Sequence, residues 1–136
     1  MPFVLDASIA ACWAFQDEDH PYAKIAFTRI RSDEAIVPKL WWFEVRNVLV
    51  INERRKRITE SQTAIFLRDL SHLRMRVDGL PEEAQLLHLA RTHQLSVYDA
   101  TYLELAQRER IPLATLDAQL AVAAHAERVP LIGHPQ

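Results

Sequence analysis

The residues whose types could carry chemistry are four carboxylates far apart in the chain: Asp6, Glu44, Asp99 and Asp117. Glu44 is the hardest to explain structurally, because at helical spacing it shares an apolar stripe with Leu40 and Val48. A carboxylate on such a stripe is costly unless a partner or a metal ion compensates its charge. The other three stand at or near predicted helix starts, where Asp is also favoured as a cap. Taken singly, each of these three could be purely structural.

Brought together, the four carboxylates would favour hydrolysis of a phosphodiester. Clustered carboxylates raise one another's pKa, and a hard divalent cation removes their repulsion. Mg²⁺ prefers oxygen ligands and bridges to substrate phosphate, where it can activate water and stabilise the leaving oxygen. Gly79 and Gly133 are the only glycines, which excludes a glycine-rich phosphate loop and argues against nucleotide binding. The hydroxyls of Ser8 and Thr115 could hold metal-bound water or serve as turn and capping residues.

Short apolar runs alternate with helical patterns along the whole chain, and this alternation predicts the elements that position the acids. The predicted strands cover residues 3–5, 35–37, 75–77, 112–116 and 129–132. The predicted helices cover residues 7–15, 22–31, 40–57, 59–73, 81–93, 96–110 and 117–127, with a loop over residues 16–21. Such an order predicts an α/β fold with a parallel sheet covered on both faces, in a single domain of residues 1–136.

The predicted order brings the four acids to one edge of the sheet. Asp6 directly follows the first strand, and Asp117 directly follows the fourth. Glu44 lies in the early turns of the helix after the second strand, and Asp99 lies in the first turn of the helix before the fourth. Helix N-termini collect at the carboxyl edge of a parallel sheet, where ligands bind. We therefore expect one acidic site at that edge.

Composition bounds the class of protein and its location. No apolar stretch approaches the roughly 20 residues that a membrane-spanning helix needs, so no membrane association is expected. The start of the chain has no basic region before its apolar run and does not resemble a signal peptide. Cys12 is the only cysteine, which excludes an internal disulfide and makes a cytoplasmic location the default expectation. The six histidines show no zinc-binding spacing.

Charge is distributed unevenly along the chain. The net charge of −2 argues against a protein that wraps duplex nucleic acid by charge alone. Residues 46–76 nevertheless hold eight basic and three acidic side chains, a net charge of +5 that leaves −7 elsewhere. This segment is either a solvated helical surface or a phosphate-contacting patch beside the acidic site. Arg46 could reach substrate or a partner, or could be a plain surface residue, and the acidic run at residues 17–19 is best explained as a solvated loop.

The predicted helix over residues 40–57 is apolar around most of its circumference. Trp41, Trp42 and Phe43 are followed by Val45, Val48 and further aliphatic residues. A surface helix usually shows a single apolar stripe. The pattern therefore indicates either complete burial within the monomer or an interface, where Trp and Phe are common anchors.

Several segments together resemble a known family. They are F-V-L-D-A-S at the N-terminus, A-F-Q-D-E-D-H-P-Y-A after the first helix, W-F-E-V-R-N-V-L in mid-chain, L-S-V-Y-D-A-T-Y-L-E-L-A later, and L-A-T-L-D. In this order and at this length they resemble the motifs of PIN domains, and most of all VapC-type toxins of VapBC toxin–antitoxin pairs. Single motifs are weak, but the likeness spans nearly the whole chain.

The resemblance has specific implications. It implies a three-layer α/β/α sandwich with a mainly parallel sheet of about five strands. It implies an endoribonuclease dependent on Mg²⁺, with Mn²⁺ as an alternative, that leaves 5′-phosphate and 3′-hydroxyl ends. The residues matching the family's acidic positions, and so implied as metal ligands and catalytic groups, are Asp6, Glu44, Asp99 and Asp117. It also implies a homodimer and a small antitoxin that blocks the site.

Three other functions compete with this one. A receiver-type phosphoacceptor domain needs an acidic pair after the first strand and a Lys after the last, whereas this chain has Asp6 alone and no late Lys. A non-catalytic RNA- or protein-binding module of the same fold would not need the complete acidic set. A PIN nuclease that serves RNA maturation would carry the same residues as a toxin, so the sequence leaves that alternative open.

Overall fold

A four-stranded parallel sheet lies at the centre of the computed structural model, which describes residues 1–15 and 17–133. The strands are β1 (Phe3–Leu5), β2 (Ala35–Val37), β3 (Met75–Val77) and β4 (Leu113–Ala114). Their order in the sheet is β3-β2-β1-β4, and every pairing is parallel. The residues of β1, β2 and β4 are all buried, as expected for strands covered on both faces.

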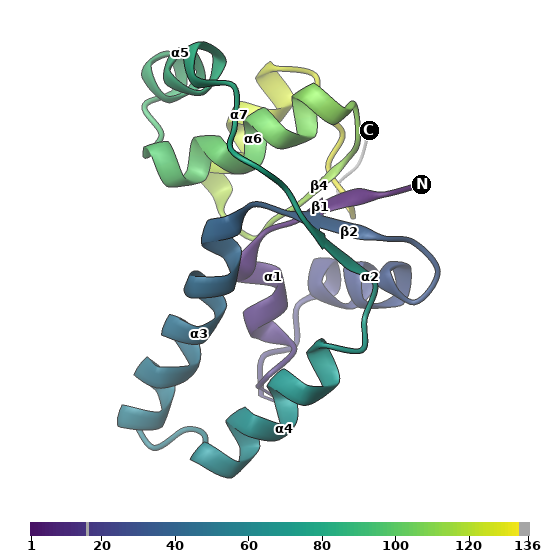
Figure 1. Cartoon of the computed structure of the whole chain (residues 1–136), viewed down its shortest axis with the longest axis vertical. Coiled ribbons are helices and arrows are strands. Elements are labelled where there is room, and N and C mark those ends of the chain that lie inside the picture. Colours follow the sequence, from purple (N-terminus) through teal and green to yellow (C-terminus); the bar gives the residue numbers. More distant parts are fainter. Residues whose placement is uncertain (16, 134–136) are drawn as a thin grey trace.

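In the described residues, seven helices cover the two faces of the sheet. They are α1 (Ala7–Cys12), α2 (Pro21–Ile30), α3 (Lys39–Arg54), α4 (Glu60–Leu70), α5 (Glu83–His93), α6 (Val97–Glu109) and α7 (Ala118–Ala126). Figure 1 shows α1 to α4 on one side of the sheet and α5 to α7 on the other. The predicted three-layer α/β/α arrangement is therefore confirmed. None of these helices combines the length and the apolar character that crossing a membrane would require.

Local sequence accounts for where the helices begin. Thr59 and Gln62 form a capping box at the start of α4, each accepting the other's backbone N–H. The side chains of Ser96 and Asp117 accept backbone N–H groups in the first turns of α6 and α7. Because β1 leads directly into α1 and β4 into α7, the start of both helices lies at the carboxyl edge of the sheet.

The prediction of a fifth strand at residues 129–132 is wrong. Only Leu131 pairs there, in an isolated parallel bridge to Leu113. Pro130 lacks an amide hydrogen and takes part only through its carbonyl oxygen, which accepts from Leu113. Gly133 then follows with a positive φ of 88°, a left-handed conformation that a regular strand does not contain.

Some element boundaries also differ from the prediction. The fourth strand covers two residues rather than 112–116, because beyond Ala114 the chain turns toward the start of α7. The first helix ends at Cys12 rather than residue 15, and α3 ends at Arg54 rather than residue 57. Gln16, at the start of the predicted loop, and His134, one of the six histidines, lie outside the described residues.

Candidate functional site

The four predicted acids occupy the carboxyl edge of the sheet, each on a different connection. Asp6 follows β1 directly, Asp117 comes three residues after the end of β4, and the two are the N-cap residues of α1 and α7. Asp99 is in the first turn of α6, and Glu44 is in the second turn of α3. The predicted placement at one edge is confirmed. Whether these residues bind metal and act in catalysis stays a prediction at this point.

Asp6 is the most buried of the four, with 6% of its surface exposed. Its Oδ2 accepts two hydrogen bonds, from the Thr115 hydroxyl at 2.6 Å and from the Ser8 hydroxyl at 2.8 Å. These hydroxyls in turn accept the backbone N–H groups of Asp117 and Leu116. Ser8 and Thr115 thus orient Asp6 and link the ends of β1 and β4. The hydrogen bond from the Asp117 N–H to the Thr115 hydroxyl also agrees with the turn role that was one of the two interpretations from the sequence.

Glu44 accepts a hydrogen bond from a residue that the sequence patterns did not indicate. The phenol of Tyr102, on α6, donates a hydrogen bond to Glu44 Oε1 at 2.6 Å. Tyr102 is completely buried, while Glu44 is half-buried. One available signal was spacing, since Tyr102 comes three residues after Asp99 and so lies one turn along the same helix.

The ionisable groups show that the acids are electrostatically coupled. Burial is the main cause that raises the pKa of Asp6, Glu44 and Asp99 above their ordinary values. The charge of Asp99 raises the pKa of Asp6 further, and both of these residues raise that of Glu44. Asp117 likewise raises the pKa of Asp99. Because such coupling falls off with distance, the four carboxylates form one cluster at this edge.

The chemistry of this cluster fits a hard divalent cation. All of its donors are oxygen atoms, which Mg²⁺ and Mn²⁺ prefer, and its mutual repulsion is what such a cation relieves. Within residues 1–15 and 17–133, however, no three His, Cys, Asp or Glu side chains are already arranged as a complete metal site. A cation bound here would therefore have to draw the carboxylates closer together.

The basic segment at residues 46–76 does not form a patch beside the acids. Helix α3 runs away from the site, so Arg54 lies about 15 Å along the helix from Glu44. Arg57 is bound by Asp17 and Glu18 on the α1–α2 loop. Arg46 is the one basic residue of this segment within a helical turn or so of Glu44. The interpretation as a solvated surface is therefore favoured for most of the segment.

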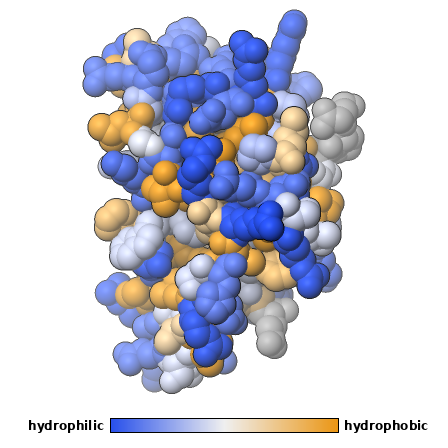
Figure 2. Space-filling model, turned by 45° about the vertical axis from the view of Figure 1, so that its right-hand side comes forward, coloured by the Kyte–Doolittle hydropathy of each residue, from blue (hydrophilic) through white to orange (hydrophobic). Residues whose placement is uncertain are grey.

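The aromatic start of α3 is divided between core and surface. Trp41 is buried, with 4% exposed, whereas Trp42 and Phe43 remain exposed. The rings of Trp42 and Phe43 meet edge to face with centroids 5.1 Å apart, and the Arg46 guanidinium lies 3.8 Å from the Trp42 ring centroid. On the face seen in Figure 2, hydrophobic residues form separate groups among hydrophilic ones. Complete burial of this segment within the monomer is thus wrong.

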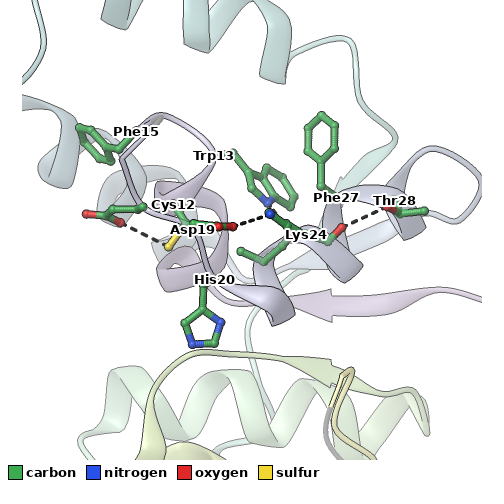
Figure 3. Close-up of a pocket in the computed structure, with 10 residues that line it drawn as sticks. Cys12, Trp13, Phe15, Asp19, His20, Lys24, Phe27 and Thr28 are labelled. Atoms are coloured by element: carbon green, nitrogen blue, oxygen red, sulfur yellow. Dashed lines mark hydrogen bonds and ion pairs between the residues drawn. The ribbon is translucent and has the colours of Figure 1, made fainter.

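A cavity of about 710 Å³ lies away from the acids, between α1, the loop after it, and α2. Figure 3 shows Trp13 and Phe27 side by side in its wall, with Cys12, Asp19 and Lys24 around it. Lys24 pairs with Asp19, and the Cys12 thiol donates to Glu18. The charged groups of this cavity are already paired, and none of the four acids lines it. We therefore do not assign the candidate catalytic site to this cavity.

Comparison with known proteins supports the same family as the sequence motifs. A family model described as the PIN domain matches residues 3–126. PAE2754 from Pyrobaculum aerophilum has a similar structure, with a TM-score of 0.70 and 20% sequence identity, over 90% of this chain and 84% of that one. VapC20 from Mycobacterium tuberculosis, described as a toxin that cleaves the sarcin–ricin loop, has a TM-score of 0.65 and 18% identity, over 89% of this chain and 94% of that one. Comparison with curated protein sequences finds no match.

Proposed function

This chain belongs to the PIN domain family, whose members are generally nucleases, and on that premise we propose that it is a metal-dependent endoribonuclease. The observation that carries the proposal is the convergence of four carboxylates at one edge of the sheet, where burial and neighbouring negative charges raise the pKa values of Asp6, Glu44 and Asp99. A site built to bind a cation and a phosphate explains why this repulsion is retained. Structural caps alone would not need all four acids at one edge.

In the proposed mechanism the metal ligands are Asp6, Glu44 and Asp99, with Asp117 as the fourth acid of the site. Bound Mg²⁺ or Mn²⁺ would supply an activated water and would stabilise the charge that develops on the RNA phosphate. Ser8 and Thr115 hold Asp6 in one orientation through its Oδ2. Asp117 also accepts the Leu120 amide, which keeps the start of α7 beside the site.

The biological role we propose is that of a VapC-type toxin in the cytoplasm, acting as one domain over residues 1–136. The likeness of its fold to that of the VapC20 toxin supports this choice over an RNA-maturation nuclease. We propose a homodimer and a small VapB-like antitoxin as its protein partners. The exposed pair Trp42 and Phe43 supports the existence of a protein interface, since aromatic side chains are common anchors there.

The first test is RNA cleavage by purified protein free of any antitoxin. Structured and single-stranded RNA would be incubated with Mg²⁺, Mn²⁺ or EDTA, using wild-type protein and the Asp99→Asn variant. Asp19→Asn is the matched control, because it makes the same change at an exposed acid paired with Lys24, away from the site. We expect cleavage that requires a cation, is lost in Asp99→Asn and is retained in Asp19→Asn.

Two results would contradict the proposal. Intact RNA under every metal condition, with protein shown to be folded, would favour the non-catalytic binding module. Cleavage that persists equally in EDTA and in Asp99→Asn would show that the activity does not use this site. A small antitoxin gene beside this one, and protection of RNA by its product, would separate a toxin from an RNA-maturation nuclease.

A further inference from the structure

One phenol connects two of the helices that meet at the acidic edge. Tyr102 lies on α6 with none of its surface exposed, and its hydroxyl donates to Glu44 Oε1 on α3 at 2.6 Å. The N-terminal halves of α3 and α6 are therefore joined by this hydrogen bond.

The hydroxyl is not needed to fill the core. A Phe ring would occupy nearly the same volume without bringing a polar atom into an apolar environment. A buried hydroxyl is costly unless it is hydrogen-bonded. The partner that satisfies the hydroxyl donor of Tyr102 is a carboxylate of the site, rather than a backbone carbonyl of the surrounding core.

The contact also restrains Glu44 itself. A Glu side chain has several rotatable bonds and loses rotamer freedom when it is held in one geometry. The hydrogen bond engages Oε1, and in the described part of the chain Oε2 has no hydrogen-bond partner. Asp6 and Asp99 are the charged groups of the site that act on Glu44. Oε2 is thus the oxygen of Glu44 that is left available to a cation.

We propose that Tyr102 is a positioning residue of the acidic site, which holds Glu44 through Oε1 so that Oε2 is presented to the cation shared with Asp6 and Asp99. This inference rests on the proposed function, because it assumes that a divalent cation binds at this edge. Tyr102 does not itself touch the metal or the substrate. Because Tyr102 already restricts the Glu44 side chain, Glu44 loses less conformational entropy when a metal binds.

The alternative is that the hydrogen bond only stabilises the fold. In that case Tyr102→Phe would lower the melting temperature and leave cation affinity unchanged. The two roles are separated by measuring Mn²⁺ affinity by calorimetry or electron paramagnetic resonance in the absence of RNA, together with thermal unfolding in EDTA. Tyr98→Phe is the matched control, since it removes a phenol oxygen from an exposed residue of the same helix.

We expect Tyr102→Phe to weaken Mn²⁺ binding by about 10- to 100-fold, the usual effect of removing a group that orients a metal ligand. Tyr98→Phe should bind Mn²⁺ as the wild type does. Glu44→Gln should weaken binding more strongly, and adding Tyr102→Phe to it should cost little further affinity, because the two changes act through the same ligand. Mn²⁺ affinity within twofold of wild type in folded Tyr102→Phe would overturn the proposal.

A second variant covers the case in which Tyr102→Phe does not fold. Glu44→Asp keeps the charge but shortens the side chain by one methylene, so that it cannot both reach the phenol and present its second oxygen at the same place. We expect a loss of Mn²⁺ affinity similar to that of Tyr102→Phe, and unchanged affinity would contradict the inference. Wild-type protein that binds no divalent cation would instead overturn the proposed function, whereas cation-dependent cleavage with an unaffected Tyr102→Phe would overturn the positioning role alone.

Discussion

Helix α6 carries a buried acid, Glu104, and a partly buried one, Asp99, and their charges are compensated in opposite ways. In its second half, Glu104 is 1% exposed and is paired with Arg108, whose Nε lies 2.8 Å from its carboxylate. Arg108 also binds Asp78 at 2.6 Å. At the start of the helix, Asp99 belongs to the acidic cluster, and within residues 1–15 and 17–133 no Lys or Arg pairs with any carboxylate of that cluster.

The comparison contrasts a structural acid, Glu104, with an acid of the proposed catalytic site, Asp99. Around Glu104 the chain supplies its own cation, so the buried charge is compensated as soon as the protein folds. Around Asp99 the chain supplies hydroxyl donors and further carboxylates, so under the proposed function the charge would be compensated by a cation from solution. Substitutions in the two places should therefore change stability in opposite directions, which the following predictions exploit.

The largest effect on stability is expected where the chain's own cation is removed. Arg108→Met leaves the carboxylate of Glu104 buried without a cationic partner, with only the Glu82 amide donating to it, and should lower the free energy of unfolding by about 3 kcal/mol. Urea denaturation measures this change. Arg91→Met, at an exposed residue near the end of α5, is the control and should change stability by less than about 0.5 kcal/mol. Equal stability of both variants would remove the basis of the comparison.

Asp6→Asn should have the opposite effect on stability and a large effect on activity. The change removes a buried charge that no cation of the chain compensates, so the melting temperature in EDTA should rise. RNA cleavage should fall by more than about 100-fold, beyond the usual effect of losing an outer-shell partner. Calorimetry in EDTA and a cleavage assay test both parts. A destabilised variant that still cleaves RNA would mean that Asp6 is only a helix cap.

The pH dependence of stability should reveal the cluster in the metal-free protein. Because the folded-state pKa values of Asp6, Glu44 and Asp99 are raised, the folded state binds protons more tightly than the unfolded state. Their contribution to stability is present below the unfolded pKa of about 4 and is lost as the pH rises through the raised values. Mg²⁺ should restore stability at pH 7 by about 3 kcal/mol at 100 times its Kd, and much less at pH 4. Melting temperatures with Mg²⁺ or EDTA that differ equally at both pH values would contradict this prediction.

A smaller effect is expected from the hydroxyls that orient Asp6. Ser8→Ala removes one of the two donors to Asp6 Oδ2 and should weaken Mn²⁺ binding by about 10-fold, at the lower end of the range for such groups. Thr115 still donates to the same oxygen, which limits the loss. Calorimetric titration with Mn²⁺ measures it, with Ser71→Ala as a control at the exposed end of α4. An unchanged affinity would show that Thr115 alone orients Asp6.

Much of the fold and the position of the acids could be predicted, because both depend on local patterns. The apolar run at β1 and the caps at Thr59 and Ser96 are readable from a few neighbouring residues. The strand at residues 129–132 was predicted from the same kind of pattern and is wrong. An apolar run shows that a segment is buried, but pairing along its length also depends on backbone donors, which Pro130 lacks.

The hydrogen-bond partners of the acids could not be predicted from local patterns, because they lie far from the acids in the sequence. Tyr102 is 58 residues from Glu44, and Thr115 is 109 residues from Asp6. The basic segment could not be placed from local patterns either. Its charges are close in sequence, but α3 runs away from the site and carries them with it. Proximity in sequence therefore left open a phosphate-contacting patch that the direction of the helix does not allow.

The sequence by itself determined the type of fold, the edge where the four acids gather, and the family motifs that contain them. These depend on hydrophobic periodicity and on residue types at strand ends, which the order of residues encodes directly. Only the tertiary structure decided that Glu104 is neutralised by Arg108, while the side chains that hydrogen-bond to Asp6 and Glu44 within the described residues do so through hydroxyl groups. The physical reason is that the energy of a buried charge depends on the groups within a few ångströms of it, and folding selects those groups from distant parts of the chain.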